Sequence, residues 1–147
     1  MKLTPNFSLA ELTYSDTAED RGIVNNPTTA HLANLTLLAV GLEQVRSLCF
    51  DNPVRIHSGY RSEALNRIVK GTLTSDHVKG FAADITVADY TPLELAKTLA
   101  DSPLVFDQLI YEPSRGIVHI SFNPRLRRQV LTQRGGPGSP IEQGIQE

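Results

Sequence analysis

The longest hydrophobic pattern in the chain is helical. Five apolar residues recur every three or four positions, namely Leu35, Leu38, Leu42, Val45 and Cys49. This spacing puts all five on one face of an amphipathic helix. The pattern therefore predicts a helix over residues 29–49, with Thr28 or Thr29 as its N-cap.

Three shorter helices are predicted from capping signals. Ser8 with Glu11 has the spacing of a capping box, in which each side chain bonds the backbone of the other residue. Thr91 with Glu94 has the same spacing, and the proline between them suits a first helical turn, so we expect a helix over 92–100. Ser62 is a third N-cap candidate, for a helix that ends before residue 71.

Four segments have the composition of strands: 54–57, 81–87, 105–112 and 117–122. Residues 113–116 read as a hairpin loop between the last two. Apolar residues alternate along 81–87 and along 117–122, so each strand has one apolar face for the core. Asp84 and His119 then project from the opposite, open faces.

The order of these elements indicates the fold class. Helices come early and in the middle, and antiparallel strands come mostly late, which favours an α+β domain with helices packed on one face of a small, mainly antiparallel sheet. A chain of 147 residues suits one domain. Residues 15–27 read as a loop. We expect the domain to span 1–132 and the Gly- and Pro-rich segment 133–147 to be a disordered tail.

Composition excludes several classes of protein. A formal net charge of -2 argues against a phosphate-neutralising nucleic-acid binder. No apolar run approaches the roughly 20 residues needed to span a bilayer, so no membrane insertion is expected. The first residues lack the apolar segment of a secretory signal. Cys49 is the only cysteine, which excludes a thiolate-rich zinc site, so a metal would need imidazole and carboxylate ligands.

Three residues form a candidate metal site. His77 lies seven residues before Asp84, and His119 projects from the open face of another strand. Catalytic zinc takes three nitrogen or oxygen ligands and leaves a fourth position open to water. Taken alone, the spacing is weak evidence, because a histidine on a strand is more often a polar surface residue.

Several motifs occur in order between about residues 6 and 128. They are Ser58-Gly59-Tyr60-Arg61-Ser62 with Leu65-Asn66, Ser75-x-His77-x-x-Gly80-x-Ala82-x-Asp84, Phe106 to Glu112, and Val118-His119-Ile120-Ser121. The combination resembles the zinc peptidoglycan peptidases, which comprise D-alanyl-D-alanine carboxypeptidases and L-alanyl-D-glutamate endopeptidases. These enzymes share a fold with lysostaphin and the hedgehog signalling domain. The compact branch of phages and prophages is the most similar.

The resemblance implies roles for particular residues. It implies that His77, Asp84 and His119 bind zinc. It also implies that Arg61 holds substrate through a carboxylate or a carbonyl group, for which a guanidinium fork is suited. Ser75 either bonds the substrate or orients the His77 loop.

One position departs from the family pattern. Well-known members carry the catalytic acid three residues before the last zinc histidine, and here that residue is Gly116. A four-residue hairpin loop would pair Glu112 with Ile117, which places Glu112 on the face of His119. We therefore expect Glu112 to be the general base. Asp107 is the second choice, because a one-residue slip in register would exchange the two.

The resemblance thus predicts a zinc metallopeptidase that hydrolyses an amide bond in the peptidoglycan stem peptide. We expect a monomeric phage or prophage lysis enzyme (an endolysin), made in the cytoplasm and released through a holin-type pore. Gly116 keeps a second hypothesis open, a non-catalytic zinc-containing binding or structural module of a phage particle, and a hydrolase of some non-wall peptide is a third. His31 and His57 fit no ligand position; His57 either donates to the substrate or only ends a strand.

Overall fold

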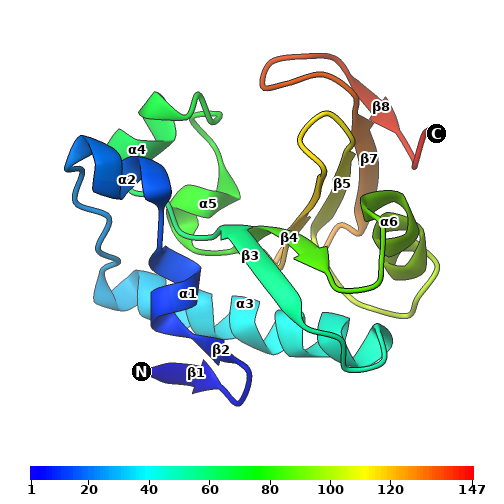
Figure 1. Cartoon of the computed structure of the whole chain (residues 1–147), viewed down its shortest axis with the longest axis horizontal. Coiled ribbons are helices and arrows are strands. Elements are labelled where there is room, and N and C mark those ends of the chain that lie inside the picture. The colour runs from blue at the N-terminus through cyan, green and yellow to red at the C-terminus, as the bar shows by residue number, and fades with distance from the viewer.

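A six-stranded sheet organises the computed structural model, which describes all residues 1–147 (Figure 1). In spatial order its strands are β3 (Val54–Ser58), β4 (Ala82–Val87), β6 (Ile117–Ser121), β5 (Gln108–Glu112), β7 (Gln129–Gln133) and β8 (Ile141–Gln143). Neighbouring strands are antiparallel except β5 and β7, which are parallel. A separate two-stranded ribbon joins β1 (Lys2–Thr4) to β2 (Phe7–Ser8).

The main helices cover one face of this sheet, so the predicted α+β class is confirmed. The long helix α3 (Thr29–Leu48) and the shorter α6 (Pro92–Ala100) contact the sheet strands and enclose the core between them (Figure 1). All five residues of the predicted helical stripe are buried. Burial of one leucine side chain is worth about 1.5–3 kcal/mol, so this stripe fixes which side of α3 faces the sheet.

The helix starts follow the predicted caps. Capping boxes begin α1 (Leu9–Thr13) at Ser8 and α6 at Thr91, and Ser62 caps α4 (Glu63–Ile68). Of the two candidates for α3, Thr28 is the N-cap: its hydroxyl accepts from the backbone of His31, and the His31 ring bonds the Thr28 backbone in return. Local hydrogen bonding therefore sets these boundaries.

The predicted loop over residues 15–27 is wrong for its first part. Helix α2 (Asp16–Arg21) forms there, between the Ser15 N-cap and Gly22, whose φ of 65° ends the helix in the left-handed region. Ala18 is its only buried residue. Such a short helix leaves no apolar periodicity in the sequence, which explains why only its caps could have revealed it.

The C-terminal segment 133–147, for which we expected a disordered tail, contains the strand β8. β8 pairs with β7 in antiparallel register, and the Thr132 hydroxyl donates to Gly144 and accepts from Gln146. Every residue of β8 is exposed. This strand is held by backbone and hydroxyl hydrogen bonds rather than by burial, so it has no hydrophobic pattern to detect.

The hairpin between β5 and β6 has the predicted register. Glu112 pairs with Ile117, and Ile110 pairs with His119. On the next strand Asp84 lies directly opposite His119. Glu112, His119 and Asp84 therefore share the face of the sheet opposite the core.

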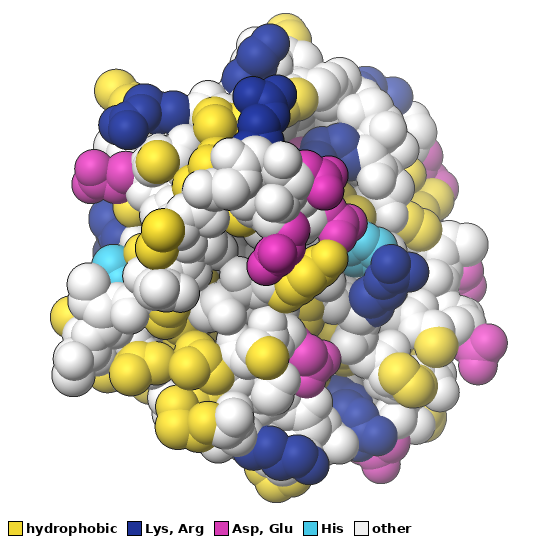
Figure 2. All heavy atoms as spheres, turned by 60° about the vertical axis from the view of Figure 1, so that its left-hand side comes forward, with side chains coloured by type: hydrophobic (Ala, Val, Ile, Leu, Met, Phe, Trp, Pro, Cys, Tyr) yellow, Lys and Arg dark blue, Asp and Glu magenta, His cyan; other side chains and the backbone are white.

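Neither sign of charge dominates the side of the molecule that Figure 2 shows. On the face drawn in Figure 2, acidic and basic side chains are interspersed with apolar ones. No helix has the length and apolar composition needed to cross a membrane.

Candidate metal centre and active-site cleft

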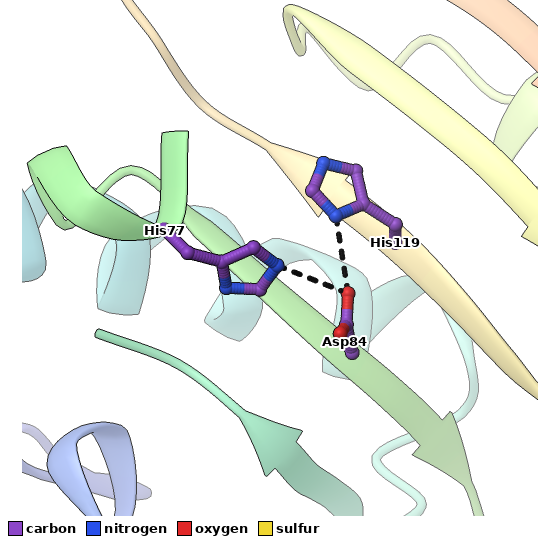
Figure 3. A group of neighbouring side chains, drawn as sticks. All are labelled: His77, Asp84 and His119. Carbon is purple, nitrogen blue, oxygen red and sulfur yellow. Dashed lines mark hydrogen bonds and ion pairs between the residues drawn. The ribbon is translucent and has the colours of Figure 1, made fainter. Parts of the chain in front are cut away.

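His77, Asp84 and His119 meet on the open face of the sheet (Figure 3). Asp84 and His119 come from adjacent strands, and His77 comes from the short helix α5 (Asp76–Lys79), which lies directly before β4. The carboxylate Oδ1 of Asp84 lies 3.2 Å from His77 Nε2 and 3.0 Å from His119 Nδ1. One ligand atom from each residue lies within 4.8 Å of the others.

The ring of His77 is held in one orientation. Its Nδ1 lies 2.7 Å from the carbonyl oxygen of Gly59. A carbonyl can only accept, so Nδ1 carries the proton and the lone pair of Nε2 faces Asp84. An outer hydrogen bond of this kind is typical of histidines that bind metals. The Ser75 hydroxyl accepts from the backbone N–H of His77, and Gly80, with φ of 85°, ends α5.

The two oxygens of Asp84 have different partners. Oδ1 faces the two imidazoles, whereas Oδ2 accepts from Arg115 Nη2 at 3.0 Å and lies 3.9 Å from Arg61 Nη2. Burial by itself would raise the pKa of Asp84, but His77 and His119 hold that pKa well below its usual value. The carboxylate is therefore ionised and available as a ligand.

This donor set fits a zinc ion. Two imidazole nitrogens and one carboxylate oxygen converge on one point, which is the set that zinc uses in peptidases. The outer bond to Gly59 fixes the tautomer of His77 that such a site requires. The site also opens into a cleft of about 750 Å³, so a fourth ligand position has access to solvent.

Glu112 is a buried carboxyl group in the same cleft. Burial and the negative charge of Asp84 raise its pKa, against the opposing charges of Arg115 and His119. Arg115 Nη1 donates to Glu112 Oε1 at 3.1 Å. A raised carboxyl pKa brings this group closer to the neutral range in which a general base is efficient.

Asp107 lies elsewhere, three residues along the chain from Ile110, the partner of His119. Its buried carboxylate accepts from Arg125 and makes two bonds with the Arg127 side chain, at 2.9 Å each. Although burial opposes the effect, these arginines lower the pKa of Asp107. Its oxygens are occupied by ion pairs that do not involve the three candidate metal ligands.

Arg61 is almost fully buried at the edge of the cleft. Its Nε donates to Ser58 and its Nη1 to Asn66, at 3.2 and 3.0 Å. Only Nη2, the atom nearest Asp84, lacks a hydrogen bond within the chain. The guanidinium is therefore rigidly positioned, with one nitrogen directed toward the metal centre.

Sequence reasoning did not identify Arg115, which bridges Asp84 and Glu112. Arg115 lies in the hairpin loop, and the only sequence signal for a functional role was its position next to Gly116. The buried Asp76 was also missed; it accepts from Ser121 and Asn123 and so anchors α5 to the end of β6. Both roles depend on tertiary contacts that leave no periodic signal.

Most of the chain matches one known protein family. The family model described as peptidase M15 matches residues 5–121, a stretch that includes all three candidate ligands and Glu112. No curated protein matches the chain. Since the matched stretch covers well over half of the sequence, the chain belongs to the peptidase M15 family.

Proposed function

We propose that this M15 metallopeptidase is a zinc enzyme that hydrolyses an amide bond in the peptidoglycan stem peptide. The family supports a peptidase that acts on peptidoglycan in general. The observation that carries the more specific proposal is the buried His-Asp-His group, whose two histidines line an open cleft. A non-catalytic surface cluster would need neither this burial nor the fixed ring of His77.

Zinc would be held by His77 Nε2, His119 Nδ1 and Asp84 Oδ1. When bound, zinc lowers the pKa of a water molecule and polarises a carbonyl group. Arg115 donates a hydrogen bond to Oδ2 of Asp84, and Arg61 lies close to the same oxygen. Oδ1 is therefore left directed at the two imidazoles. This arrangement favours a carboxylate that binds through one oxygen.

Glu112 is the proposed general base. Its carboxylate accepts a proton from the attacking water and returns one to the leaving amine, the usual double role of such a group. Arg115 holds one of its oxygens, which limits the orientations that the carboxylate can adopt. Arg61 and Ser75 also line the cleft and are proposed to bind the substrate.

The biological setting is proposed from the sequence resemblance. The motifs most resemble the compact phage and prophage branch, so we propose a monomeric lysis enzyme that reaches the cell wall through a holin-type pore. The bond cleaved is that of a D,D-carboxypeptidase or of an L-alanyl-D-glutamate endopeptidase. The position of Glu112 is compatible with both, since either reaction needs one base beside one metal ion.

Digestion of purified sacculi tests the proposal directly. The zinc-loaded protein is expected to release muropeptides whose masses identify the cleaved bond, and chelator should abolish the release. Zinc binding without cleavage of sacculi or of a soluble stem pentapeptide would overturn the proposal. That outcome would support instead a zinc-containing structural module, which Gly116 at the usual acid position favours.

A further inference from the structure

His57 occupies an irregular position at the end of β3. Ile56 pairs with Ile85 and Ser58 pairs with Asp84, so His57 is an extra residue in a β-bulge. Bulges often occur beside active sites, where they redirect a side chain. Here the bulge allows both His57 and Ser58 to line the cleft.

One nitrogen of the His57 ring is anchored and the other is free. Nε2 lies 2.8 Å from the Thr86 hydroxyl. Nδ1 has no hydrogen-bond partner within the chain, and the residue is exposed to the cleft. The ring is thus held in place without using its full hydrogen-bonding capacity.

The sheet register places this ring beside the candidate metal centre, level with Glu112 along the strand direction. Ile85 pairs with Val118, so Thr86 and Ile117 follow on the next row, and Ile117 pairs with Glu112. The anchor of His57 and the proposed base therefore lie on one row, adjacent to the row of Asp84 and His119. Because β3 and β5 lie on either side of β4 and β6, His57 and Glu112 flank the space in front of the ligands.

His57 is neither a positively charged group at neutral pH nor a member of the candidate metal site. Burial and the neighbouring Arg55 lower its pKa, with Arg115 acting in the same direction and Asp84 opposing it, so the ring is neutral at neutral pH. It does not belong to the group of side chains that converge to hold a metal. A neutral, anchored imidazole is suited to hydrogen-bond an uncharged peptide group.

We propose that His57 is a substrate-binding residue, whose Nδ1 bonds a main-chain group of the peptide on the side of the cleft opposite Glu112. The inference rests on the proposed peptidase function. One hydrogen bond to an uncharged group is worth about tenfold in binding at most. His57 should therefore contribute mainly to KM rather than to kcat.

Steady-state kinetics on a soluble stem pentapeptide test this role. His57→Ala should raise KM by about 5- to 10-fold with kcat changed less than about threefold, and His57→Gln, which keeps a donor and an acceptor, should recover part of the loss. Thr86→Val removes the anchor and should raise KM less. His31→Gln is the matched control, since His31 lies outside the cleft and glutamine can preserve the capping box of α3.

The outcomes separate this inference from the proposed function. An inactive wild-type protein would refute the peptidase function itself. An active wild type with unchanged KM in His57→Ala would refute only the role of His57. A fall in kcat of more than 100-fold at unchanged KM would also overturn it, because it would make His57 a proton-transfer group. Zinc content measured in each variant should equal that of the wild type.

Discussion

At the scale of single residues, Asp84 connects the proposed metal site to the rest of the cleft. It faces both imidazoles through one oxygen and two arginines through the other. Its complete burial leaves it no solvent to compensate for a lost partner. A change at any of the three ligands should therefore disturb the whole group.

The first prediction concerns metal content. The wild-type protein should bind about one zinc per chain, and His77→Ala, Asp84→Ala or His119→Ala should each reduce this strongly, because two ligands rarely retain zinc. Elemental analysis after dialysis measures the content, with His31→Gln as the control. Undiminished zinc in all three variants would show that the ligands lie elsewhere.

The second prediction distinguishes the two candidate bases. Glu112→Gln keeps the shape of the side chain but cannot accept a proton, so kcat should fall about 10²- to 10⁴-fold with zinc retained. Asp107→Asn should leave kcat near wild type and instead lower the free energy of unfolding by about 1–3 kcal/mol, because it weakens charged hydrogen bonds to Arg125 and Arg127. Activity and thermal unfolding are measured on both variants. The reverse ranking in kcat would make Asp107 the base.

At the scale of elements, the helices and strands that could be predicted were those marked by residues close to them in the sequence, such as caps, turns and apolar repeats. The loop length of the β5–β6 hairpin was enough to give its register and so the face of Glu112. The bulge at His57, the bridge through Arg115 and the pairing of β8 were not predictable. The bulge and the bridge from Arg115 to Asp84 depend on neighbours distant in sequence, and β8 is exposed along its whole length. None of the three alters the alternation of apolar and polar residues.

The third prediction concerns the turn after β3. A Cβ at Gly59 would lie 2.4 Å from the carbonyl oxygen of Leu12, so the backbone would have to move. Gly59→Ala should destabilise the fold by about 1–3 kcal/mol, as overpacking does. It should also weaken zinc binding, because the same turn carries the carbonyl that orients His77. Gly116→Ala is a useful comparison, since its Cβ meets nothing within 4 Å, although its φ of 65° adds some strain. Equal zinc affinities in wild type and Gly59→Ala would disprove the coupling.

At the scale of the whole molecule, the sheet separates two environments. One face packs against α3 and α6 in a cluster of 22 buried residues, whose last member along the chain is Phe122. The other face carries the candidate metal ligands and the cleft. The β7–β8 hairpin lies beyond the end of the M15 match at residue 121, yet Gln133 and Ile141 line the cleft. This hairpin therefore adds to the lining of the cleft. It contacts the main core only at the edge of that core, through partly buried residues such as Val130.

The last prediction follows from that division. Truncation after Arg134 keeps β7 and the whole main core, so the shortened chain should fold and bind zinc. It should lose about 1–3 kcal/mol of stability, because the bonds of Thr132 to Gly144 and Gln146 disappear with β8. For a chain of this size that corresponds to a fall of roughly 3–10 °C in Tm.

The same truncation should also lower substrate affinity, since the cleft loses the wall that Ile141 provides. Ile141→Ser in the full-length chain keeps the strand pairing, and it should weaken substrate binding while leaving Tm almost unchanged. Calorimetry and the stem-pentapeptide assay measure the two effects separately. A truncated chain that is unfolded would mean that β8 belongs to the folding core, and one with unchanged Tm and KM would mean that the hairpin has no role in either.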